Sequence, residues 1–192
     1  MKRLAAFGAA AVCFTGAPLA EAVEREHQIG ADVGPDMLVI GKLSPTFGLS
    51  AGAHYTYGLN DQFTLMAELT WSFVSLGESI NARTPHTHPA WIGNADVGIG
   101  YVFDVLRWVP YAGVLLGGYS LAGRTVRPVK VYLGVELALG LDYRIDRRFT
   151  VGVALRQHML SDPTLYPNFD NAFAAYPSFS QAMARAEYVW GW

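Results

Sequence analysis

The feature that most restricts the fold of this sequence is an alternation of apolar with small or polar residues over long segments. In residues 63–73 every second residue is apolar: Phe63, Leu65, Ala67, Leu69, Trp71 and Phe73. The intervening residues are mostly small or polar. Because successive side chains of a β-strand point to opposite faces, a period of two predicts a strand with one apolar face.

Similar alternation, of varying strength, recurs along the chain. We expect eight strands, near residues 27–35, 46–59, 63–73, 91–103, 108–120, 131–143, 149–158 and 185–192. The first is weak, and in 108–120 the two faces cannot be told apart. In 131–143, Val131, Leu133, Val135 and Leu137 form one face, opposite Gly134 and Glu136.

Composition shows why the alternation matters. The chain is 52% hydrophobic and only 16% charged, whereas soluble domains carry about 25% charged residues. After the first twenty or so residues, no apolar run approaches the ~20 needed for a membrane-spanning helix. The apolar residues are therefore spread along strands. Acidic residues outnumber basic ones, 16 to 14, which argues against a nucleic-acid partner.

The N-terminal segment is typical of a cleaved secretory signal peptide, predicted to cover residues 1–22. Lys2 and Arg3 precede an apolar stretch, and Ala20-Glu21-Ala22 forms a small-x-small cleavage site. The only cysteine, Cys13, lies inside this segment. We expect residues 23–192 to form one domain without disulfides. A retained membrane anchor is the alternative.

The connections between the expected strands alternate in length. Short, polar turns contain GLND, DVLR and RIDR, whereas the other four connections cover about 36–45, 76–90, 121–129 and 161–178. Short turns at one end, long loops at the other and an even strand number are typical of an outer-membrane barrel. We therefore predict an all-β fold, an eight-stranded antiparallel up-and-down transmembrane β-barrel.

A soluble barrel also alternates, but it turns its apolar face inward. Three features favour the membrane: strands of about 11–14 residues, a second face nearly free of lysine, and aromatic residues gathered at strand ends. One end would carry Phe47, Trp71, Phe73 and Trp91. The other would carry Tyr57, Phe63, Phe103, Tyr143, Phe149, Trp190 and Trp192.

The last residues, AEYVWGW, strengthen this interpretation. Tyr188, Trp190 and Trp192 alternate along the final strand, and an aromatic last residue resembles the C-terminal assembly signal of outer-membrane barrels, although Trp replaces the more usual Phe. Residues 28–192 resemble the small eight-stranded OmpA/OmpX/OmpW-like barrel proteins. This resemblance implies a bacterial outer-membrane location, recognition by the barrel-assembly machinery, and contact with membrane lipid and lipopolysaccharide. We expect a monomer.

The opposite faces of the strands would place ionisable residues in the lumen. These are Asp32, His54, Glu68, Asp96, Glu136, Arg156, His158, Arg185 and Glu187. Because charges inside a membrane protein are costly unless paired or hydrated, we expect an internal ion-pair network that closes or narrows the barrel. A narrow, cation-favouring water path lined by the acids is the alternative.

Other sites have weaker support. His158, Ser161 and Asp162 are residue types that could perform acyl transfer, but the lipid A deacylases of this architecture pair a His with a Ser two residues later, where this chain has Leu160. His86 and His88 could share a metal ion, but no third ligand is evident. We therefore expect no enzyme activity, cofactor or metal. The expected role is structural or that of a small pore, with ligand binding or adhesion through the long loops as the alternative.

Overall fold

The computed structural model describes residues 25–39, 45–76, 89–103, 107–123, 126–160 and 178–191. Eight strands account for most of them: β1 (His27–Val39), β2 (Thr46–Gly58), β3 (Phe63–Leu76), β4 (Trp91–Val102), β5 (Trp108–Gly123), β6 (Val126–Arg144), β7 (Phe149–Leu160) and β8 (Ser178–Trp190). No helix in this part of the chain is long and apolar enough to cross a membrane. The predicted signal peptide lies outside the described residues.

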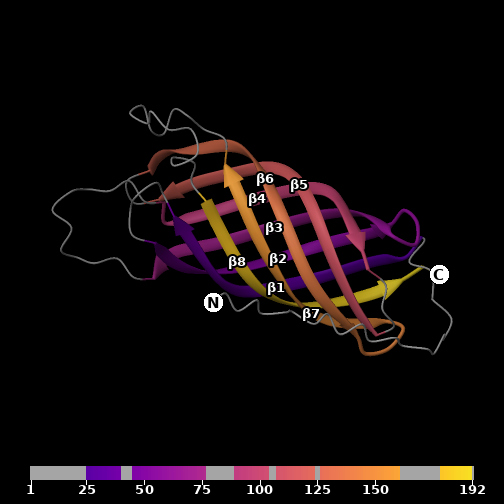
Figure 1. The fold of residues 1–192 in the computed structure, drawn as a ribbon. Helices are drawn as coiled ribbons and strands as arrows, with labels where there is room; N and C mark the ends of the chain where they lie inside the picture. Colours follow the sequence, from indigo (N-terminus) through magenta and orange to yellow (C-terminus); the bar gives the residue numbers. More distant parts are fainter. Residues whose placement is uncertain are drawn as a thin grey trace, which may run out of the picture.

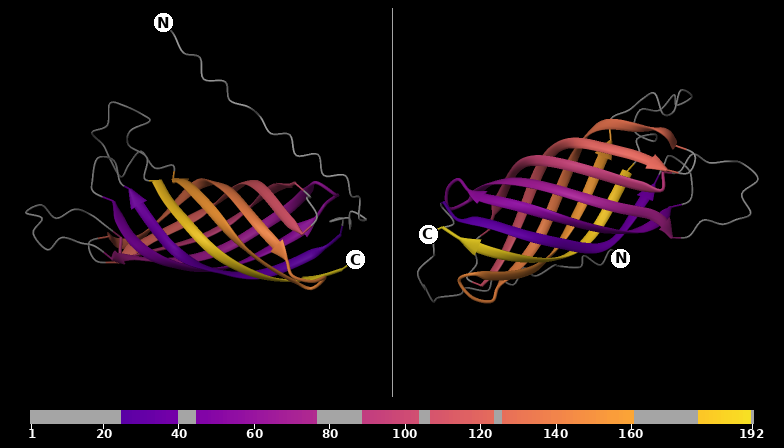
Figure 2. Two further views of the ribbon diagram at one scale, coloured as in Figure 1. Left: turned by 60° about the horizontal axis from the view of Figure 1, so that its bottom comes forward. Right: turned by 180° about the vertical axis from the view of Figure 1, so that it is seen from behind.

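The strands form a closed barrel in which each strand is antiparallel to its sequence neighbours (Figure 1). Closure is made by β8 against β1, where Trp190 lies opposite His27 and Ser178 opposite Val39. Figure 2 shows the same tilted barrel from two further sides. The predicted fold class, an eight-stranded antiparallel barrel, is confirmed.

Strand ends differ most from the sequence prediction in three places, and the connections predicted to be long at 36–45 and 121–129 are shortened to 40–45 and 124–125. β1 continues through Pro35 to Val39, β6 begins at Val126, and β8 begins at Ser178 rather than near Arg185. Proline has no N–H to donate to a neighbouring strand. Accordingly, in the described ladder between β1 and β8, Val33 and Asp36 have partners whereas Gly34 and Pro35 do not.

We call the end where β2, β4 and β6 finish the turn end, and the opposite end the loop end. Two turns at the turn end are closed by similar contacts. Asn60 Oδ1 accepts hydrogen bonds from the backbone of Gln62 and Phe63, and Asp146 Oδ1 accepts from Arg148 and Phe149. Such side-chain acceptors stabilise tight turns. These turns hold β2 against β3 and β6 against β7.

The outer surface is apolar, as the alternation predicted. Val33, Leu69, Val131 and Leu133 are 60%, 63%, 73% and 73% exposed. Soluble monomers rarely expose large continuous apolar surfaces. This wall is suited to contact with lipid.

Aromatic residues flank the apolar wall at both ends. Near the loop end, Trp71 and Trp91 stack with ring centroids 4.6 Å apart. At the turn end, three pairs join neighbouring strands: Phe63–Tyr101, Trp108–Tyr143 and Phe149–Tyr188. Aromatic rings favour the boundary between lipid and water, so these two groups mark the edges of the membrane-facing band.

The barrel interior is more apolar than the sequence suggested. At the loop end, a group that we call the loop-side layer consists of Leu38, Val74, Ile92, Tyr119, Leu121, Tyr132, Leu160 and Phe179. A second group, the turn-side cluster, consists of Met66, Val102, Tyr111, Leu115, Ala138, Ala154 and Met183. The sequence pattern does not distinguish the two faces of β5. In the structure its inward face contains Tyr111, Leu115, Tyr119 and Leu121.

Candidate functional site in the barrel lumen

All nine ionisable residues that the sequence placed in the lumen are buried, none more than 5% exposed. They come from seven strands, β5 being the exception. Their burial follows from the alternation of side chains along each strand. Because every second residue of a strand faces lipid, the residues between them point into the lumen.

Arg156 on β7 is surrounded by carboxylates from three other strands. Its Nη2 lies 3.1 Å from Asp32 Oδ2, and its Nε lies 2.9 Å from Glu68 Oε2 and 3.6 Å from Glu136 Oε1. Arg156 therefore ties β7 to β1, β3 and β6 across the lumen.

Arg185 on β8 makes a second centre, nearer the turn end. It is paired with Glu187, and its Nε lies 3.6 Å from Asp142 Oδ1 and 3.9 Å from Asp32 Oδ1. Its guanidinium carbon lies 4.8 Å from the ring centroid of Tyr111. An aromatic face is a favourable neighbour for a cation.

His54 on β2 lies between two carboxylates. Its Nδ1 is 2.7 Å from Asp32 Oδ2, and its Nε2 is 2.8 Å from Glu187 Oε1. Asp32 therefore contacts His54 and both arginines. These contacts form one connected group of charged side chains, which we call the charged centre: Asp32, His54, Glu68, Glu136, Asp142, Arg156, Arg185 and Glu187.

A chain of polar contacts lies between the charged centre and the loop-side layer. His158 contacts Tyr119 Oη through Nδ1 and Gln181 Oε1 through Nε2, each at 3.0 Å. Gln181 in turn donates from Nε2 to the hydroxyl oxygens of Ser50 and Ser72. Ser50 donates to Asp36 Oδ2 at 2.5 Å.

Several members of these groups are not among the residues predicted from the sequence. Asp36 was placed in a connection, and Gln181 lay before the expected start of the last strand. Asp142 had the correct inward parity in 131–143 but was not selected. Extending the alternation by one residue after 35 and by four residues before 185 places Asp36 and Gln181 on the inward face.

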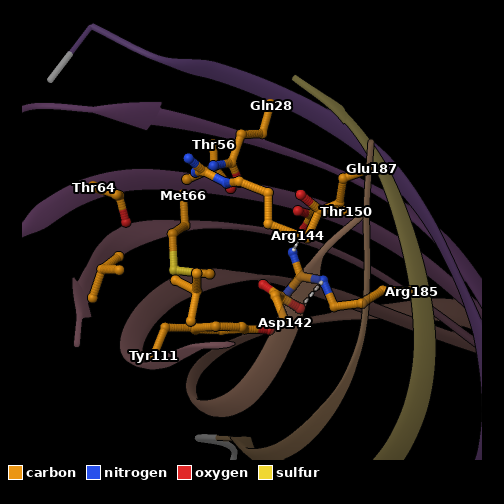
Figure 3. A pocket seen from close by; sticks show the side chains of 12 residues that line it. Gln28, Thr56, Thr64, Met66, Tyr111, Asp142, Arg144, Thr150, Arg185 and Glu187 are labelled. Carbon is orange, nitrogen blue, oxygen red and sulfur yellow. Dashed lines mark hydrogen bonds and ion pairs between the residues drawn. The ribbon is translucent and has the colours of Figure 1, made fainter. Parts of the chain in front are cut away.

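The turn end of the lumen contains a hollow of about 490 Å³, part of it open solvent. Its lining includes Gln28, Thr56, Met66, Tyr111, Asp142, Arg144, Arg185 and Glu187. Figure 3 shows Arg185 reaching toward Asp142 and Glu187 at this hollow. At its rim, Arg144 Nη2 is 3.0 Å from Glu26 Oε1, linking the residue before β1 to the end of β6.

The remaining sequence-predicted residues divide into two groups. Tyr188 and Trp190 face outward and are 40% and 37% exposed, and Trp190 stacks on His27 at the β1–β8 seam with centroids 5.4 Å apart. Trp192, Ser161, Asp162, His86 and His88 lie outside the described residues. β7 ends at Leu160, directly before Ser161.

Comparison with known proteins gives structural matches only. No family model matches the chain, and no curated protein matches it by sequence. The structure of Neisserial surface protein A (NspA) matches with a TM-score of 0.63 at 14% identity, covering 84% of this chain and 96% of that one. The N-terminal β-barrel domain of Pseudomonas aeruginosa OprF matches with a TM-score of 0.54 at 13% identity, over 87% and 98%.

A third match is Ail, the attachment invasion locus protein of Yersinia pestis, with a TM-score of 0.53 at 13% identity, over 87% of this chain and 99% of that one. At these identities the likeness concerns the fold. Together with the apolar wall and its aromatic edges, it identifies the chain as a small eight-stranded barrel of the bacterial outer membrane.

Proposed function

We propose that this protein is a structural outer-membrane barrel whose lumen is closed. The observation that carries the proposal is the succession of two filled levels inside the wall: the charged centre and, nearer the loop end, the loop-side layer. A solute would have to displace both in order to pass.

The loop-side layer is the stronger obstacle to an ion. Its members come from seven of the eight strands, and each is at most 5% exposed. An ion entering such an apolar constriction would lose its hydration without gaining a ligand. The charged centre then closes the lumen by ion pairing, because Arg156 and Arg185 are paired with carboxylates from several strands.

The test is single-channel conductance of the folded protein in a planar bilayer, for the natural sequence and Glu136→Gln. We expect no reproducible steps from either protein. Cation-selective steps from the natural sequence that change in Glu136→Gln would replace this proposal with a small pore. Folding of each sample is checked first by the heat-dependent shift in gel mobility that closed barrels show.

A second candidate function is binding through the connections at the loop end. The supporting observation is the length of two of them: 14 residues separate β3 from β4 and 17 separate β7 from β8, whereas six separate β1 from β2 and two separate β5 from β6. Ail, described as an attachment invasion locus protein, is a barrel of the same fold. Replacing 78–88 and 163–176 with short Gly-Ser linkers should abolish adhesion of expressing bacteria to cultured cells while the barrel still folds. Unchanged or absent adhesion would remove this candidate.

We also propose that Tyr188, Trp190 and Trp192 act as the signal for the barrel-assembly machinery. Two described contacts support this: β8 forms the closing seam with β1, and Trp190 stacks on His27 within that seam. The expected partners are this machinery, outer-membrane lipid and lipopolysaccharide, and the expected state is a monomer. We propose no catalytic role, because His158 is enclosed and both of its ring nitrogens are engaged by Tyr119 and Gln181.

A further inference from the structure

Three potential metal ligands meet between the charged centre and the loop-side layer. Asp96 on β4, Glu136 on β6 and His158 on β7 each offer one ligand atom, and these atoms lie within 4.8 Å of one another. The three residues are 4%, 0% and 0% exposed. The cluster is therefore enclosed by the barrel and formed by strands that are not all neighbours.

Two of these side chains have buried carboxylate oxygens without hydrogen bonds from any described residue, although Asn94 Nδ2 donates to the other oxygen of Asp96. Within the part of the chain that the structure describes, Glu136 Oε1 and Oε2 and Asp96 Oδ1 have no hydrogen-bond partner. Arg156 Nε lies 3.6 Å from Glu136, beyond hydrogen-bonding distance, and is shared with Glu68 at 2.9 Å. Unpartnered, buried carboxylate oxygens are costly and indicate a missing cation or donor.

The hydrogen bonds of His158 leave one ring nitrogen suited to a metal. Gln181 donates from Nε2 to Ser50 and Ser72, which directs its Oε1 toward His158. Oε1 can only accept, so the His158 proton resides on Nε2. Nδ1 therefore carries the lone pair, which accepts from the Tyr119 hydroxyl in this structure and would become a metal ligand once that hydroxyl turned aside. Nδ1 lies 3.6 Å from Glu136 Oε2. Metal-bound histidines commonly donate their second N–H to such an acceptor.

The backbone provides space for the aspartate of this cluster. Asp96 lies directly opposite Gly117 in the β4–β5 ladder. A Cβ at position 117 would collide with the Asp96 carboxylate and with the Ala95 carbonyl oxygen. The glycine therefore lets the Asp96 side chain lie across β5 toward Glu136 on β6.

We propose that Asp96, Glu136 and His158 bind a divalent transition-metal ion in the barrel lumen. Two carboxylates and one imidazole suit borderline ions such as Zn²⁺ and Co²⁺, and also the harder Mn²⁺. The two carboxylates balance a dication, and the Tyr119 hydroxyl, 3.0 Å from His158 Nδ1, lies where a further ligand could complete the coordination. Such an ion would join β4, β6 and β7 across the lumen.

The experiment is metal binding by the folded protein in detergent. The protein is refolded from denaturant with and without Zn²⁺, passed through a desalting column and analysed for metal. We expect one zinc per chain and a higher midpoint of thermal unfolding with zinc. With Co²⁺, we expect visible absorption bands that report coordination by nitrogen and oxygen ligands.

Variants separate this site from other ways of holding zinc. His158→Gln and Glu136→Gln should each weaken binding at least tenfold, and Gln181→Leu should weaken it about 10–100-fold by removing the partner of His158 Nε2. His54→Gln, which changes another buried lumen histidine, and the double variant His86→Ala/His88→Ala should retain zinc.

Either of two results would overturn the proposal. The first is a natural-sequence protein, shown to be folded, that retains no zinc and has an unchanged melting midpoint. The second is zinc that is retained in Glu136→Gln and His158→Gln but lost in the His86/His88 variant, which would assign the metal to the loops.

Discussion

The loop-side layer and the charged centre fill the same barrel by different means. The first consists of apolar side chains that pack against one another, with Phe179, Ile92 and Tyr119 fully buried. The second consists of carboxylates that depend on two arginines, and several of its oxygens lack hydrogen bonds within the described residues. Loss of one side chain from the apolar layer therefore leaves a cavity, whereas loss of one side chain from the charged centre leaves a buried charge without its partner.

The largest loss of stability is expected when the cation at the middle of the charged centre is removed. In Arg156→Met the side-chain volume is largely kept, but Asp32, Glu68 and Glu136 lose their shared partner. Breaking a buried pair costs about 3–5 kcal/mol. We expect a loss of this size in the free energy of unfolding, measured by urea titration in lipid vesicles.

The control is Arg144→Met at the rim of the lumen. Its side chain is 19% exposed, and the carboxylate of its partner Glu26, 5% exposed, also accepts from Gln28. We therefore expect a smaller loss, of about 1–2 kcal/mol. Equal losses in the two variants would show that the charged centre is hydrated and contributes little by its pairing.

The loop-side layer is tested by Phe179→Ala. Removing a fully buried ring leaves a cavity, and we expect a loss of about 3 kcal/mol in the free energy of unfolding. The same variant should admit water to the loop end, which hydrogen exchange of the amides in β8 and β1 would detect. Phe73→Ala is the control, because Phe73 is 61% exposed on the outer face at the same end of the barrel.

The position of the barrel wall in the bilayer can be tested by placing an arginine at two different depths on its outer surface. Leu155 is 61% exposed near the middle of β7, and Ile145 is 54% exposed in the turn before β7. We expect Leu155→Arg to cost about 2–4 kcal/mol and Ile145→Arg about 0–1 kcal/mol, because the cost of a charge depends on its depth in the bilayer. Equal costs in folding titrations would contradict the position assigned to the membrane.

The smallest effects concern inward and outward glycines. A Cβ at Gly152 would collide with the Asp142 carboxylate, whereas a Cβ at Gly118 would meet nothing within 4 Å. We expect Gly152→Ala to lower the free energy of unfolding by about 1–3 kcal/mol. Gly118→Ala should be neutral or slightly stabilising, and a loss as large as that of Gly152→Ala would mean that backbone freedom, not space, explains both glycines.

The fold was predictable from the sequence because its outer face has to be apolar along the full depth of the membrane. Segments such as 63–73 therefore show the period of two without interruption. The same parity identified which residues point inward, including Asp32, Arg156 and Arg185. Their partners were not predictable, since Asp32 and Arg156 are 124 residues apart and meet only when the barrel closes.

The loop-side layer escaped prediction because the alternation fails at the strand ends. Around Leu38 the residues are apolar on both faces, as Met37, Leu38 and Val39 follow one another. At the start of β8 the pattern is reversed: Phe179 points inward between two serines. A method that looks for apolar residues on the outer face assigns both regions to connections.

The position of Asp32 has a consequence for how the chain attains its structure. Asp32 is on the first strand, and both arginines that neutralise it are on the last two. A barrel that closed prematurely, before β7 and β8 had joined, would enclose Asp32 and Glu68 without Arg156 and Arg185, the two arginines that pair with them. The charge distribution along the chain therefore disfavours barrels with fewer than eight strands during assembly. Only the complete barrel brings Asp32 on β1 to Arg156 on β7 and Arg185 on β8.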